Sequence, residues 1–167
     1  AHSKAPVIAS HSSARALSNH PRNLDDEQLE WVKENGGVVQ AVALALFVNK
    51  EKHQKYRDSL KTLEDKTDAE ALTALKKEFP PVDVADFVDH IDYIKNKIGI
   101  DHVGISSDFD GGGGIEGWKD ASETFNVTLE LVKRGYTEEE ISKIWSGNLL
   151  RVLDETAKIA SELQKAK

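Results

Sequence analysis

The chain has 167 residues, of which 39% are hydrophobic and 31% charged, and its formal net charge is −7 at pH 7. It contains no cysteine and no methionine, which excludes disulfides, thiolate metal sites and a cysteine nucleophile. An acidic chain without a basic stripe binds nucleic acid poorly, so we expect no nucleic-acid partner. No run of about 18 apolar residues occurs, so we expect no membrane span.

The first half of the chain predicts two strands, a helix and an insertion. Residues 6–10 and 37–44 are short apolar runs, typical of strands that are buried on both faces of a parallel sheet. Between them, Asp25 and Gln28 have the spacing of a capping box, which predicts the start of a helix. Residues 48–80 predict a pair of Lys/Glu-rich helices inserted after the second strand.

The second half continues this alternation. Asp83 predicts the cap of a helix with an apolar stripe at 3.6-residue spacing, and residues 102–107 form a third apolar run. Thr137 and Glu140 form another capping-box pattern. Gly147 and the asparagine after it predict a break, after which the helix restarts.

Strands alternating with helices predict an α/β fold with right-handed crossovers. Three strands are too few for a closed (β/α)8 barrel, which usually takes roughly 250 residues. The pattern therefore predicts the last three βα units of a (β/α)8 TIM barrel. It also predicts that both edges of the sheet are exposed.

Polar residues follow two of the predicted strands at their carboxyl ends, where α/β folds bind ligands. His11 ends the first strand and is either a metal ligand or general base, or a loop histidine bonded to nearby backbone. Asp108 and Asp110 follow the third strand and suit metal binding or acid–base chemistry; for Asp110 a role as a turn residue is favoured. His102 begins its strand and is expected at the opposite end.

Three further features allow two interpretations each. Arg22 suits capture of a carboxylate, or is an ordinary surface arginine. Residues 111–114 are four glycines that either let backbone approach a ligand or form a flexible loop. His90 and Asp92 have the spacing of a metal pair, but on a helix they diverge by about 200°, so we expect packing or surface roles.

Several segments together resemble the membrane (renal) dipeptidase family of zinc peptidases. They are Pro6–Ala14, His20–Asn23, Asn35–Val39, Ile100–Ile105, Ser107–Gly111, Arg134–Thr137 and Gly147–Val152, in the same order along nearly the whole chain. Residues 48–80 match least.

The resemblance implies a (β/α)8 barrel of the metal-dependent hydrolase type with two bridged zinc ions, which hydrolyses dipeptides, some with D-residues, and β-lactam analogues. It implies that His11 is a metal ligand and that Arg22 binds the substrate's terminal carboxylate. It also implies that Asp108 is the catalytic carboxylate beside a metal-bound hydroxide. The other metal ligands would lie in a half of the barrel before Ala1.

The sequence therefore predicts that residues 1–167 are the C-terminal portion of a single catalytic barrel domain, inactive alone, with a helical insertion at about 48–80. Its partners would be a dipeptide and either an N-terminal half-barrel or another chain, and a homo-oligomer is possible. One alternative is a non-catalytic half-barrel fragment that associates through its exposed strands. A weaker one is a metal-dependent phosphoryl or glycosyl transfer enzyme that uses Asp108 and Asp110.

Overall fold

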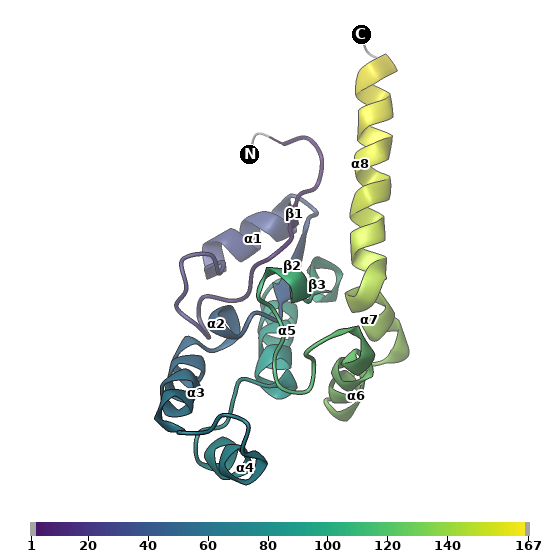
Figure 1. Ribbon diagram of the computed structural model, residues 1–167. Coiled ribbons are helices and arrows are strands. Elements are labelled where there is room, and N and C mark those ends of the chain that lie inside the picture. Colours follow the sequence, from purple (N-terminus) through teal and green to yellow (C-terminus); the bar gives the residue numbers. More distant parts are fainter. Residues whose placement is uncertain (1–2, 166–167) are drawn as a thin grey trace.

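A computed structural model describes residues 3–165 and centres on a three-stranded parallel sheet (Figure 1). The strand order is β1 (Ile8–Ala9), β2 (Val38–Val42) and β3 (Val103–Ser106). In register, Ala9 pairs with Val39, and Val39 in turn pairs with Val103. The three predicted strands are therefore confirmed, and the chain has an α/β fold.

The central strand β2 and the edge strand β1 differ in burial. All five residues of β2 are buried, as predicted. The prediction that every strand is buried on both faces is wrong for β1, where Ile8 is 45% exposed; Val7, just before the strand, is 40% exposed. Strand β3 also lies at an edge, but helices α5 and α8 pack against it, whereas the main packing partner of β1 within the described residues is β2. The side chains of β1 therefore lack a covering helix in this part of the chain. Both edges of the sheet are thus open within residues 3–165.

Two capped helices pack beside the sheet and against each other. In α1 (Asp26–Glu34), the Asp25 side chain accepts from the Gln28 amide and the Gln28 side chain from the Asp25 amide, so the predicted capping box is confirmed. Asp83 caps α5 (Val84–Ile98) in the same way, with Asp86 as its partner. The apolar stripe of α5 supplies much of the core, through Val84, Phe87, Val88, Ile91, Ile94 and Ile98.

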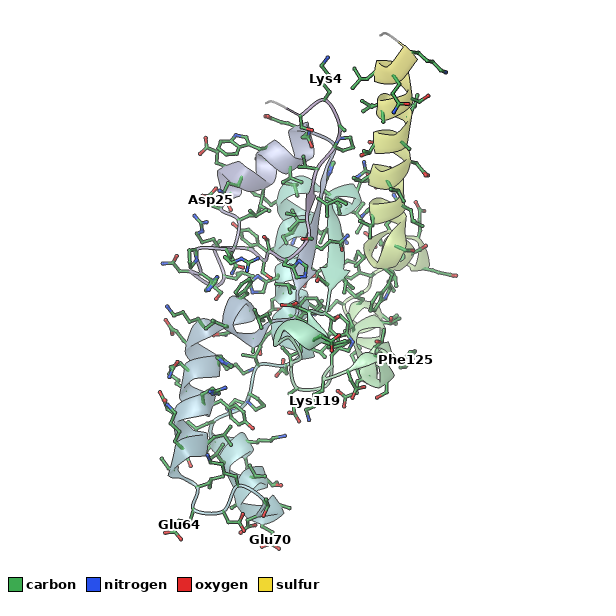
Figure 2. All side chains as sticks on the ribbon, turned by 45° about the horizontal axis from the view of Figure 1, so that its top comes forward. Lys4, Asp25, Glu64, Glu70, Lys119 and Phe125 are labelled. Carbon is green, nitrogen blue, oxygen red and sulfur yellow. The ribbon has the colours of Figure 1, made fainter. Side chains whose placement is uncertain are left out.

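The pair of helices predicted for residues 48–80 is present, after a short helix. The short helix α2 (Ala45–Val48) leads into α3 (Lys50–Thr62) and α4 (Ala69–Glu78). None of the α3 residues, all of which are described, is buried, and in α4 only Leu75 is. In both views the α3–α4 hairpin projects from the body at its lower end, with Glu64 and Glu70 near its tip (Figures 1 and 2).

The last part of the chain is helical. Helix α6 (Phe125–Lys133) precedes α7 (Glu138–Ser142), whose Thr137 capping box is confirmed, and α8 (Asn148–Lys165) projects upward in Figure 1. The predicted break is a single π turn (Lys143–Gly147), so the chain widens rather than interrupts its helix. No helix within residues 3–165 is long and apolar enough to cross a membrane.

Candidate active site

His11 and Asp108 come together at the carboxyl end of the sheet, as their positions after β1 and β3 predict. His11 Nε2 lies 3.7 Å from Asp108 Oδ1. The other ring nitrogen of His11, Nδ1, is 2.9 Å from Ser10 Oγ, which leaves Nε2 facing the carboxylate. Both side chains remain partly accessible, at 43% for His11 and 24% for Asp108. A histidine and a carboxylate that are close and accessible suit metal binding or proton transfer.

Asp108 is held in a tight loop after β3. It has a left-handed backbone with φ 53°, the one positive φ among non-glycine residues of the described chain, and such conformations cluster at functional sites. Its carbonyl accepts hydrogen bonds from the amides of Gly111 (3.0 Å) and Gly113 (2.7 Å). A Cβ on Gly113 would lie 2.1 Å from the Ser107 carbonyl oxygen. The glycines therefore allow the backbone to fold closely around Asp108.

Arg22 approaches the same site from the loop after β1. Its guanidinium carbon lies 5.5 Å from the centre of the Phe47 ring. The His20 ring stacks on Phe47, with centroids 4.1 Å apart, and His20 Nδ1 accepts a 3.3 Å hydrogen bond from the Arg22 amide. Burial lowers the pKa of His20, and the positive charges of Lys50 and Arg22 lower it further. This region therefore favours a neutral imidazole beside a guanidinium that is free to bind an anion.

These side chains share one open pocket of about 510 Å³, lined by His11, His20, Arg22, Leu44, Phe47, Asp108 and Gly111. A larger hollow of about 720 Å³ lies beside Trp31 and Lys4, near the amino ends of β1 and β2. We place the candidate site in the smaller pocket because it gathers the titratable groups at the carboxyl end of the sheet.

Two buried polar side chains, Asn23 and His90, support the pocket. The sequence predicted a packing or surface role for His90 and no such role for Asn23. Asn23 accepts from the Ser13 amide (3.0 Å) and donates to the carbonyls of Ser18 (2.9 Å) and Phe47 (2.8 Å). His90 accepts from the Ala14 amide through Nδ1 (3.0 Å), and its Nε2 lies 2.7 Å from the Val48 carbonyl. Both side chains thus tie the loop after β1 to α2.

Other candidates from the sequence lie away from the pocket. Asp110 is exposed in the 3₁₀ turn Phe109–Gly111, so it is the turn residue that was favoured. Asp92 accepts from Tyr136 (2.5 Å) and from Arg134 (2.6 Å), which agrees with a packing role rather than a metal pair with His90. His20 and Phe47 were missed as pocket residues. His20 is adjacent to the Pro-Arg-Asn segment, whereas Phe47 carries no sequence signal.

The described residues do not form a complete metal site in the pocket. Within residues 3–165, no three His, Cys, Asp or Glu side chains group closely enough to hold a metal ion. A catalytic zinc takes about three protein ligands, and His11 with Asp108 supplies two candidate groups. A metal bound here requires further ligands from outside the described residues.

The whole length of the chain, residues 1–167, matches the sequence profile of the membrane dipeptidase family (peptidase family M19). The chain belongs to this family. It is 38% identical over 159 residues to dipeptidase ataJ of Aspergillus terreus, a match covering 95% of this chain and 32% of that protein. It is 35% identical over 161 residues to dipeptidase aclJ of Aspergillus oryzae, covering 96% and 32% respectively. The chain thus spans about a third of the length of these relatives.

Solved structures of dipeptidases have the same fold over this region. The probable dipeptidase PvdM from Pseudomonas aeruginosa aligns with a TM-score of 0.75 and 40% identity, covering 93% of this chain and 46% of that one. A metallopeptidase from Rhodobacter sphaeroides, bound to a phosphinate mimic of L-Ala-D-Ala, aligns with a TM-score of 0.73 and 25% identity. This second match covers 92% of the present chain and 37% of the other. The sheet and its helices therefore correspond to part of a dipeptidase fold.

Proposed function

We propose that this dipeptidase-family chain is the C-terminal catalytic portion of a zinc-dependent dipeptidase, and that it is inactive by itself. The observation that carries the proposal is the convergence of His11, Asp108 and Arg22 on one pocket. The three come from two loops that are about 90 residues apart in sequence, at the end of the sheet where α/β enzymes bind ligands. The membership in a dipeptidase family and the phosphinate-bound relative support dipeptides as the substrate class.

Two residues of the pocket would act on different parts of a short substrate: Arg22 on its terminal carboxylate and Asp108 on its leaving amine. Arg22 offers donors in a planar fork that suits a terminal carboxylate. Asp108, which lines the same pocket from the loop after β3, would carry a proton to the leaving amine. A substrate whose terminal carboxylate is fixed by Arg22 and whose scissile bond lies near Asp108 would be a short peptide, and membership in a dipeptidase family favours dipeptides.

We propose zinc as the cofactor, with two ions in the completed enzyme and His11 as one ligand from this chain. When bound, such ions activate water and polarise a carbonyl. The described residues do not hold a metal by themselves, so the remaining ligands would come from the missing portion. The described pocket therefore supplies substrate binding and proton transfer.

The missing portion is proposed to complete a (β/α)8 barrel, of which residues 1–167 form the last three βα units in one domain. Large apolar side chains are exposed on α6 and α8, including Phe125 (69%), Leu153 (61%) and Leu150 (54%); Figure 2 labels Phe125 at the surface of α6. These faces and the open sheet edges fit burial against an N-terminal half-barrel or another chain, in a homo-oligomer or a larger protein. The alternative is a non-catalytic fragment that associates through its exposed strands.

The test joins this chain to the preceding portion of PvdM, its 40%-identical relative, and measures zinc content and dipeptide hydrolysis. We expect about two zinc ions per particle and activity that Asp108→Asn removes, while the 167-residue chain alone has neither. Zinc-dependent hydrolysis by the chain alone would contradict the proposed incompleteness. An assembled particle that contains no zinc would favour the non-catalytic alternative. The transferase alternative is disfavoured because Asp110 does not line the pocket.

A further inference from the structure

The Phe47 ring lies beneath the binding pocket and contacts two of its polar residues, although it takes no part in the proposed chemistry. Phe47 is 5% exposed and sits on α2, directly after β2. The His20 ring stacks on it at 4.1 Å with an angle of 28° between the planes. The Arg22 guanidinium lies 5.5 Å from the centre of the same ring. One aromatic ring thus contacts both a histidine and the arginine proposed to bind substrate.

The Arg22 side chain has no other strong restraint in the described part of the chain. Its guanidinium takes part in none of the ion pairs within 4.0 Å there, and its one hydrogen bond, to His20, uses the backbone amide. A free arginine has about 2 kcal/mol of rotamer entropy, part of which is lost when it binds a carboxylate. Contact with an aromatic face restrains the guanidinium and leaves its N–H edges available.

The loop that carries Arg22 is itself fixed relative to this ring. The His20 amide donates to the Ser18 carbonyl (2.7 Å), and the Asn23 amide donates to the His20 carbonyl (3.0 Å). The Asn23 side chain then donates to the Phe47 carbonyl (2.8 Å). The arginine, the stacked imidazole and the ring are therefore parts of one hydrogen-bonded unit.

We infer that Phe47, together with the stacked His20, is the positioning residue that orients Arg22 for a substrate carboxylate. The inference rests on the proposed function, because it assumes that Arg22 binds this carboxylate. The ring acts by limiting the conformations of the guanidinium before substrate arrives. Its loss should weaken substrate binding and leave the bond-breaking step nearly unchanged.

The test uses the assembled enzyme described above and measures KM, kcat and the Kd of a phosphinate dipeptide mimic. Phe47→Leu removes the ring but keeps an apolar side chain, whereas Phe47→Tyr keeps the ring. We expect Phe47→Leu to raise KM and Kd roughly fivefold, within the range of a cation–π contact, with kcat within about twofold. Phe47→Tyr should restore both values to near those of the unmodified enzyme.

A double-mutant cycle separates positioning from a general packing role. In an Arg22→Ala background, Phe47→Leu should have no further effect on Kd. An equal loss in both backgrounds would show that Phe47 does not act through Arg22 and would overturn the inference.

If Phe47→Leu fails to fold, His20→Ala replaces it in the cycle with the same expectation. If Arg22→Ala itself leaves Kd unchanged, the proposed carboxylate site is wrong; if Arg22→Ala weakens binding but Phe47→Leu does not, only this inference fails.

Discussion

Replacing Asn23 with alanine should destabilise the fold strongly, because this one buried amide holds three backbone groups. Asn23 is fully buried, and its bonds to the Ser13 amide and to the Ser18 and Phe47 carbonyls are all 3.0 Å or shorter. The Ser18 carbonyl also accepts from the His20 amide at 2.7 Å, so it stays paired in the variant. The Ser13 amide and the Phe47 carbonyl lose the partner that Asn23 provides.

An unsatisfied buried backbone group costs about 1–3 kcal/mol, so two such groups predict a loss of roughly 2–6 kcal/mol. A typical domain has a free energy of unfolding of about 5–15 kcal/mol. The loss in Asn23→Ala is therefore a large fraction of the total and should be easily measured by urea unfolding. Asn19→Ala is the matched control, since Asn19 is exposed in the same loop and should change stability by less than about 0.5 kcal/mol.

The assay is equilibrium urea unfolding of the 167-residue chain, followed by circular dichroism, with the midpoint and slope fitted for each variant. A lower midpoint at unchanged slope reports a change in folded-state stability. A loss below about 1 kcal/mol for Asn23→Ala would refute the reasoning, because it would mean that water or a relaxed loop replaces the amide at little cost.

Three further predictions follow from other contacts. Arg134→Ala should cost about 1.5–3 kcal/mol in urea unfolding, as expected for charge-assisted hydrogen bonds, because Arg134 joins Asp89 and Asp92 of α5 to Glu130 of α6. The control is Arg57→Ala, at an exposed position outside any described ion pair, and an equal loss in both variants would contradict this account. Burial lowers the pKa of His90 below its usual value, so the unfolded chain binds the extra proton first and stability should fall as pH drops below about 6.5; a His90→Gln chain should show a shallower fall, and an unchanged slope would exclude His90 as the cause. Replacing residues 50–78 by a short Gly/Ser linker should leave the sheet folded, since only Leu75 is buried there. The helical insertion is hypothesised to be a lid or a dimer contact, and the same deletion in the assembled enzyme would contradict this hypothesis if substrate preference and association state were unchanged.

Much of the fold follows from local sequence signals. The capping boxes at Asp25, Asp83 and Thr137 predicted helix starts that the structure shows, because a cap needs only residues three apart in sequence. The burial of β1 could not be predicted in the same way. The apolar run 6–10 resembles that of β2, but burial depends on which helices cover a strand, and β1 packs mainly against β2 within residues 3–165.

The sequence predicted the parts of the candidate site that depend on the direction of the strands. It did not predict the parts that depend on packing between distant segments. His11 and Asp108 meet because each follows a parallel strand, and parallel strands end at one edge. Phe47 reaches the pocket only because α2 folds back beside the loop that carries Asn23, and this contact joins residues 24 positions apart. No pattern within one element indicates it.

The histidines show how hydrogen bonding separates structural from chemical roles. His90 has both ring nitrogens against backbone groups, so it has no free nitrogen for a ligand. His102, at the amino end of β3, has its Nδ1 2.8 Å from the Gly37 carbonyl and lies at the end of the sheet away from the pocket. His11 alone of these three combines the carboxyl end of a strand with an Nε2 that faces a carboxylate. Two criteria therefore select His11: its position at the carboxyl end of a strand, and a ring nitrogen that is not bonded to the backbone. His11 is thus the first metal-ligand candidate to mutate in the assembled enzyme.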